Sequence, residues 1–107
     1  MSRFADVLGR LAATIEARKG ADAAASYTAQ LLSDPARAAK KLGEETVETV
    51  IAAAKGQRDE LAAESADLIY HWLVVLAASG VSLDEVATKL EAREGTSGLA
   101  EKAGRKA

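Results

Sequence analysis

Two acidic pairs lie at mirrored positions on either side of Gly56 and restrict how the middle of this chain can fold. The first pair is Glu45 and Glu48, the second is Glu64 and Asp67, and the members of each pair are three residues apart. On an α-helix this spacing places both side chains on one face, about one turn apart. An antiparallel helical hairpin that turns at Gly56 would set Glu45 opposite Asp67 and Glu48 opposite Glu64. The sequence therefore predicts a hairpin on which four carboxylates meet.

Helical periodicity and end signals predict two helices before this hairpin. Apolar residues recur at helical spacing in a first segment that should run from about Arg3 to Arg18. Ser26 is a plausible N-cap for a short second helix. Asp34 followed by Pro35 is typical of a cap and a first helical residue, so the long third helix should begin there.

The hairpin itself should consist of this third helix, ending near Lys55 and Gly56, and a fourth helix that Asp59 can cap. Beside the acidic pair, the third helix carries an apolar stripe made of Val47, Val50, Ile51 and Ala54. We expect this stripe to be buried, with the carboxylates flanking it.

The second half of the fourth helix, from Leu68 to Ala78, is apolar almost all round. A helix of this kind must be buried on several sides. We expect its surface to form a subunit seam, which the substitution Leu73→Asp would test. Gly80 should end this helix, and a capping box from Ser82 to Glu85 should open a final helix.

Composition favours an all-α fold. Hydrophobic residues make up 49% of the chain, but nearly half of them are alanine, which forms helices readily and buries little area. A chain of 107 residues fits one domain, and its core would be thin. We therefore expect a helical hairpin that assembles into a four-helix-bundle-like oligomer, a dimer or a dimer of dimers. The helical domain should span residues 1–93, with residues 94–107 as a C-terminal tail.

Several classes of protein are disfavoured by what the chain contains. The net charge is −2 and the basic residues are scattered, so a nucleic-acid-binding surface is not expected. The chain has no cysteine, which rules out disulfides and thiolate metal sites. No apolar run approaches the roughly 18 residues of a membrane span, and the N-terminus lacks the apolar core of a signal peptide. We expect a cytoplasmic protein without a membrane partner.

The acidic stripe predicts a bound cation. Each like-charged neighbour at helical spacing destabilises a helix by roughly 0.2–0.5 kcal/mol, and Glu44 adds to the stripe. Carboxylate clusters suit hard divalent cations, above all Mg²⁺ with its waters and substrate phosphates. An ordinary charged surface is the alternative. A ferritin-like di-metal site would need Glu-x-x-His on two helices, whereas His71 follows Asp67 by four, and we interpret it as a hydrogen-bonded residue of a buried helix.

Two lysines precede the stripe and have two readings. Lys41 lies three and four residues before Glu44 and Glu45, so ordinary salt bridges would explain it. Alternatively, Lys40 and Lys41 contact the oxygens of a metal-bound polyphosphate. The sequence leaves both readings open.

Longer stretches resemble one enzyme family. Residues 40–48, followed by residues 64–71, resemble phosphoribosyl-ATP pyrophosphohydrolase, the histidine-pathway member of the all-α NTP pyrophosphohydrolases. Ser26 to Leu32 resembles the N-terminal motif of this family, and Arg93 to Gly98 with Glu101 and Lys102 resembles its C-terminal signature. The resemblance covers nearly the whole chain. Because the chain lacks the cyclohydrolase domain to which some members are fused, we expect the stand-alone form.

The resemblance implies hydrolysis of the α–β phosphoanhydride of 1-(5-phosphoribosyl)-ATP to phosphoribosyl-AMP and pyrophosphate, the second step of histidine synthesis. Under this hypothesis Mg²⁺ is the cofactor, and one of the glutamates is the general base toward water, most plausibly Glu48 or Glu45. The metal ligands would be Glu45, Glu48, Glu64 and Asp67, with Glu44 a weaker candidate, and the phosphate contacts would be Lys40, Lys41 and Arg93. A general NTP pyrophosphohydrolase and a non-catalytic helical dimerisation module are the alternatives.

Overall fold

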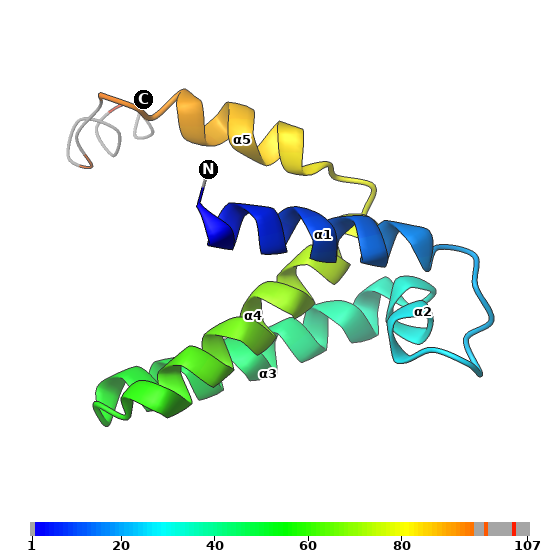
Figure 1. The fold of residues 1–107 in the computed structure, drawn as a ribbon, viewed down its shortest axis with the longest axis horizontal. Helices are drawn as coiled ribbons and strands as arrows, with labels where there is room; N and C mark the ends of the chain where they lie inside the picture. The colour runs from blue at the N-terminus through cyan, green and yellow to red at the C-terminus, as the bar shows by residue number, and fades with distance from the viewer. Residues whose placement is uncertain (1, 96–97, 99–103, 105–107) are drawn as a thin grey trace.

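The computed structural model describes residues 2–95, 98 and 104, and this part of the chain is all-α. It contains the predicted helices in the predicted order (Figure 1). Their bounds are α1 Arg3–Ala17, α2 Tyr27–Leu32, α3 Pro35–Ala54, α4 Arg58–Ala78 and α5 Leu83–Glu91. The prediction of an all-α fold is confirmed.

Helices α3 and α4 form the long hairpin of the molecule. The two helices lie side by side in Figure 1 and make the most extensive contact between any two helices of the described chain. Gly56 turns the chain between them with a φ of 68°, a left-handed conformation that glycine adopts without strain. The Thr49 hydroxyl lies 2.8 Å from the Glu45 carbonyl oxygen of its own helix and 3.2 Å from the Glu64 carbonyl oxygen of α4, so it links the two helices beside the acidic pairs. The predicted hairpin is therefore confirmed.

Most of the predicted helix ends are confirmed, and one is wrong. The Ser26 hydroxyl accepts a hydrogen bond from the backbone of α2, and the Asp34 carboxylate does the same for α3. The predicted cap of α4 is wrong, because this helix begins two residues earlier than a cap at Asp59 would allow: Gln57 is the N-cap and makes no side-chain bond to the helix, and Asp59 lies inside the first turn. There Asp59 still interacts favourably with the positive end of the helix dipole.

The core forms where the second half of α4 meets α1 and α2. Its buried residues are Ile15, Leu31, Ala38, Leu73 and Val74. Leu73 is only 4% exposed within a single chain. The expectation that Leu73→Asp would probe a subunit seam is therefore wrong, because that substitution would place a charge in the core of the chain itself.

The apolar stripe on α3 is also placed differently from the prediction. Val47, Val50 and Ile51 are 58%, 61% and 47% exposed, whereas the buried residues of this helix are Ala38 and Ala52. The prediction that the stripe is buried is thus wrong for a single chain. Helix α4 packs on the small-residue side of α3 and leaves the larger apolar side chains outside.

Two further predictions concern α4 and the C-terminus. By length and composition alone, α4 would be able to cross a membrane, contrary to the expectation from the sequence. Within a single chain 17% of its apolar window is buried, and the buried residues, which include Val74, lie in the core of this fold. Of the predicted C-terminal signature, Arg93 and Gly95 lie in the turn after α5, whereas Thr96, Ser97, Glu101 and Lys102 fall outside the described residues.

Candidate functional site

Three carboxylates converge where the middle of α3 faces the first half of α4. Glu45 and Glu48 come from α3 and Glu64 comes from α4, and one oxygen of each lies within 4.8 Å of one oxygen of the other two. The spacing of three residues puts the two α3 side chains on one face, and the hairpin turn brings Glu64 against them. The structure therefore gathers three of the four predicted metal ligands.

Two oxygens of this cluster are buried without a hydrogen-bond partner among the described residues. They are the Oε2 atoms of Glu45 and Glu64. A buried acceptor without a donor loses its hydration and gains nothing in exchange, so such groups are rare in native proteins. A cation bound between the helices would satisfy both oxygens. The orphaned oxygens and the all-carboxylate donor set fit a hard divalent cation such as Mg²⁺.

The electrostatics of the cluster support the same reading. The pKa of Glu64 is raised to about 7, first by a hydrogen bond to Glu48 that requires a shared proton, then by burial and by the neighbouring charges. The pKa of Glu45 is also raised, chiefly by burial and then by Glu48, while His71 acts in the opposite direction. Without a cation, the cluster thus retains protons that ordinary carboxyl groups would have lost.

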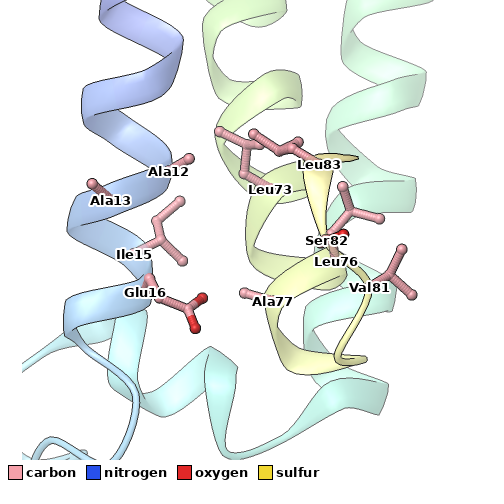
Figure 2. Close-up of a pocket in the computed structure, with 10 residues that line it drawn as sticks. All are labelled: Ala12, Ala13, Ile15, Glu16, Leu73, Leu76, Ala77, Val81, Ser82 and Leu83. Atoms are coloured by element: carbon pink, nitrogen blue, oxygen red, sulfur yellow. The ribbon is translucent and has the colours of Figure 1, made fainter. Parts of the chain in front are cut away.

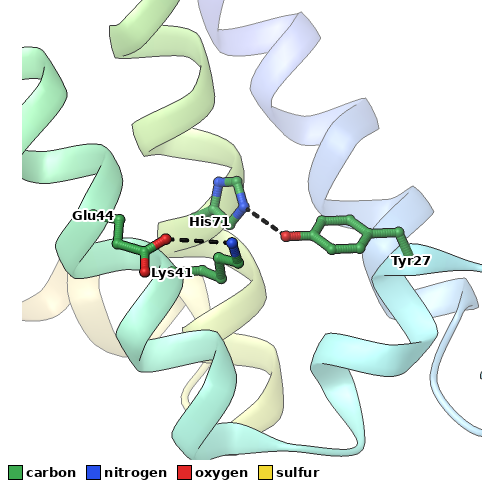
Figure 3. Close-up of polar contacts among 4 residues, drawn as sticks. All are labelled: Tyr27, Lys41, Glu44 and His71. Carbon is green, nitrogen blue, oxygen red and sulfur yellow. Dashed lines mark hydrogen bonds and ion pairs between the residues drawn. The ribbon is translucent and has the colours of Figure 1, made fainter.

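The other two acidic candidates lie at the edge of this cluster. Asp67 is outside the group of three, but its charge raises the pKa values of Glu45 and Glu64, so it is close enough to interact with both. Glu44 instead accepts from the Lys41 ammonium at 3.3 Å (Figure 3). The structure therefore keeps Asp67 near the site and occupies Glu44 with a salt bridge.

The three basic candidates are not equivalent. Lys41 forms the salt bridge to Glu44, which is the ordinary reading of its position before the stripe. Lys40 is exposed and forms no ion pair within the described part of the chain. Arg93 lies beyond the end of α5, in the turn that follows it. None of the three is in hydrogen-bond contact with the carboxylate cluster.

His71 ties α2 to α4 beside the site. It is 8% exposed, and its Nδ1–H donates to the Asp67 carbonyl oxygen at 2.8 Å. In the neutral ring the Nε2 atom is then an acceptor, and the Tyr27 hydroxyl donates to it at 3.4 Å (Figure 3). The interpretation of His71 as a hydrogen-bonded residue of a buried helix is confirmed. The role of Tyr27 was not predicted, although it lies in a motif that the sequence singled out.

A cavity of about 320 Å³ opens directly beside the carboxylates. Glu48 and Glu64 form part of its wall, and Lys55 and Gln57 lie at the hairpin end of it. No pattern in the sequence predicted this cavity, because Lys55 stands where a helix ordinarily ends. A cavity of about 370 Å³ between α1, α4 and the start of α5 is mostly apolar and contains none of these residues (Figure 2). The carboxylate cluster therefore adjoins the smaller, polar cavity.

Comparison with known proteins identifies related sequences along almost the entire chain. Residues 8–94 match the family described as "Phosphoribosyl-ATP pyrophosphohydrolase". The "Phosphoribosyl-ATP pyrophosphatase" of Caulobacter vibrioides is 76% identical over 103 residues, which cover 96% of both chains. Proteins of the same name from Caulobacter sp. (strain K31) and Cereibacter sphaeroides (strain KD131 / KCTC 12085) are 72% identical over 105 residues and 61% identical over 100 residues. These two alignments cover 98% of both chains in the first case, and 92% of this chain and 97% of the relative in the second.

Proposed function

Because the chain belongs to the phosphoribosyl-ATP pyrophosphohydrolase family, we propose that it hydrolyses phosphoribosyl-ATP to phosphoribosyl-AMP and pyrophosphate, a step of histidine biosynthesis. The match to residues 8–94 includes α3 and α4 entirely, and with them the carboxylate cluster. This coincidence of a family match with a clustered acidic site is the observation that carries the proposal.

The proposed cofactor is Mg²⁺. Glu45, Glu48 and Glu64 would hold it, with Asp67 next to them, and the buried unpartnered oxygens of Glu45 and Glu64 support this assignment. When bound, the ion supplies charge neutralisation on the phosphate oxygens and orients water. Carboxylate oxygens are typical protein ligands of this ion, which usually also keeps several waters and contacts substrate phosphates.

Among the glutamates, Glu48 is the best candidate for the general base. It is exposed, whereas Glu45 and Glu64 are partly buried, so water and substrate can reach it. In the proposed reaction Glu48 accepts a proton from water, the water oxygen forms a bond to phosphorus, and the anhydride bond between the α and β phosphates breaks to release pyrophosphate. Glu45 and Glu64 lie in the same cluster as Glu48, and Glu48 itself lines the cavity.

Further contacts to the substrate are proposed for the predicted basic residues. Lys40 is exposed at the start of the acidic face and can reach a phosphate. Lys41 would have to exchange its salt bridge to Glu44 for a phosphate oxygen, an exchange with little penalty because exposed salt bridges contribute only about 0–1 kcal/mol. Arg93 is proposed only from its place in the C-terminal signature.

We also propose that the protein is a cytoplasmic homo-oligomer. Leu31 and Val74 are the largest fully buried side chains in the described chain, so one copy has a small core. The exposed apolar stripe of Val47, Val50 and Ile51 on α3 would be covered by a second copy. A Val50→Glu substitution should then lower the mass of the particle in solution without unfolding the helices, as sedimentation and circular dichroism would measure. An unchanged mass would place the seam elsewhere.

The experiment that tests the function is release of pyrophosphate from phosphoribosyl-ATP, with ATP and dUTP as parallel substrates, each in Mg²⁺ and in EDTA. Metal-dependent release from phosphoribosyl-ATP alone would agree with the proposal. A preference for a free nucleotide would instead make the chain a general NTP pyrophosphohydrolase. If none of the substrates released pyrophosphate, a helical interaction module would be the better description.

A further inference from the structure

The polar cavity next to the carboxylate cluster is lined by a positively charged side chain, that of Lys55. Besides Glu48 and Glu64, its lining consists of Ile51, Ala52, Lys55, Gln57 and Glu60, and its volume is about 320 Å³. Because two of the proposed metal ligands form part of its wall, the cavity is continuous with the catalytic site. In the part of the chain that the structure describes, Lys55 is the single basic residue that lines it.

Lys55 is the C-cap residue of α3 and lines the same cavity as Glu48 and Glu64. Glu48, Ile51 or Ala52, and Lys55 follow one another at helical spacing, so they share one face of the helix and its end. Seven residues separate Glu48 from Lys55, which corresponds to about 10 Å along the axis. Side chains on a helix tilt toward its N-terminus, and a long, flexible lysine in this place therefore leans toward Glu48.

Lys55 has no competing ion pair in the part of the chain that the structure describes. The ion pairs there are made by Lys19 with Glu16 and by Lys41 with Glu44. Gln57, on the same rim, does not use its amide to cap α4. Both side chains can therefore donate hydrogen bonds into the cavity.

The remaining walls indicate which part of a substrate fits here. Among the described residues no aromatic ring lines the cavity, and its apolar residues are Ile51 and Ala52, so these walls offer no platform for a base. Glu48, Glu60 and Glu64 outnumber the single ammonium group, so a bare anion would be repelled. An anion that enters together with a divalent cation would be balanced. A phosphate group with its metal has this chemistry.

We propose that Lys55 is a substrate-binding residue that holds the β and γ phosphates of the substrate, the pyrophosphate leaving group, in this cavity. The inference rests on the proposed function and adds a direction to it: pyrophosphate lies toward the hairpin turn, and the phosphoribosyl-adenosine portion lies on the other side of the carboxylates. Gln57 donates a second hydrogen bond to the same oxygens.

The test compares inhibition by the two products in Lys55→Met, Lys55→Arg and Arg58→Met variants. Arg58 carries the same charge at the same end of the hairpin but does not line the cavity, so its variant is the matched control. Loss of a charge-assisted contact should weaken inhibition by pyrophosphate about tenfold in Lys55→Met. Inhibition by phosphoribosyl-AMP, which lacks these phosphates, should be unchanged, and Lys55→Arg should retain most of the pyrophosphate affinity. Thermal unfolding of each variant checks that the fold is kept.

Calorimetric titration of pyrophosphate into the enzyme, in Mg²⁺ and in EDTA, gives a readout that does not depend on turnover. We expect binding in Mg²⁺, weakened in Lys55→Met but not in Arg58→Met, and little binding in EDTA. Equal losses of pyrophosphate and phosphoribosyl-AMP affinity, or an unaltered pyrophosphate affinity, would overturn the proposal. Its failure is distinguishable from failure of the proposed function, because a wild-type enzyme inactive on phosphoribosyl-ATP would be detected before any variant is made.

Discussion

The two halves of α4 differ in their residues: the first half contributes an acidic residue to the carboxylate cluster, and the second half contributes apolar residues to the core. In residues 58–67 the helix presents Glu64 to the carboxylates of α3, next to a polar cavity, and the charge of Asp67 raises the pKa values of Glu45 and Glu64. In residues 68–78 it buries Leu73 and Val74 against α1, α2 and α3. The first half therefore contributes to the carboxylate cluster, and the second half contributes to the hydrophobic core.

This division has a physical reason. Carboxylates with buried, unpartnered oxygens destabilise the free protein, because their charges repel and their hydration is lost. A rigid helix transmits the anchoring of its core half to its acidic half, so the side chains stay close together despite the repulsion. A metal site thus gains its geometry from packing that lies one to three turns away. Substitutions in the two halves should have separable effects.

The largest expected effect is on turnover. Glu48→Gln keeps the size of the side chain but removes both the proposed base and one negative charge of the cluster. We expect pyrophosphate release from phosphoribosyl-ATP to fall by about 10²–10⁴-fold, with unchanged helicity and a melting temperature that is equal or higher. Steady-state kinetics and circular dichroism would measure this. Full activity in the variant would remove Glu48 from the mechanism.

A large effect on the free energy of unfolding, but not on turnover, is expected from a substitution in the second half of α4. Leu73→Ala leaves a cavity in the core and should lower the free energy of unfolding by about 2–5 kcal/mol. Leu90→Ala is the control, because Leu90 is 61% exposed and its truncation should change the stability by less than about 0.5 kcal/mol. Urea unfolding of both variants makes the comparison. Equal losses would mean that burial in one chain does not decide stability.

A smaller effect should appear as a dependence of stability on pH. The pKa of Glu64 is about 7 in the folded chain against 4.5 for the free group, so the folded state binds the extra proton. Stability from this group is fully present below about pH 4.5 and is lost as the pH rises through 7. The melting temperature in EDTA should therefore fall between pH 5 and pH 7.5 more steeply in the wild type than in Glu64→Gln.

Saturating Mg²⁺ should oppose this fall, because a bound cation favours the ionised carboxylates. Glu91→Gln, on the exposed surface of α5, is a matched control and should retain the slope of the wild type. If the Glu64→Gln variant had the same slope as the wild type, the raised pKa would not contribute to stability.

The smallest effect is expected for Glu44→Gln. Glu44 is a neighbour of the cluster in sequence but pairs with Lys41 at the surface. Loss of an exposed salt bridge should change stability by at most about 1 kcal/mol, and turnover should stay within about twofold of the wild type. Kinetics and thermal unfolding check both. A loss as large as that of Glu48→Gln would show that Glu44 belongs to the site.

Much of the fold was predictable because it depends on local interactions. The hairpin follows from Gly56 between two helical patterns, and the caps at Ser26 and Asp34 depend on residues only three positions away. The cap predicted at Asp59 was wrong because the prediction misplaced the helix start by two residues. A capping side chain must precede the first helical residue, and sequence patterns place helix ends only to within one or two residues.

The sequence by itself determined the helices, the turn between α3 and α4, and the placement of each acidic pair on one helix face, because all of these follow from helical geometry. Only the tertiary structure decided the rotation of α3 and α4 about their axes, and hence which of their faces are in contact. That rotation brings Glu64 to Glu45 and Glu48, leaves Val50 exposed, and opens the cavity beside Lys55. Periodicity does not specify it, because the rotation results from side-chain packing between segments that are distant in the sequence.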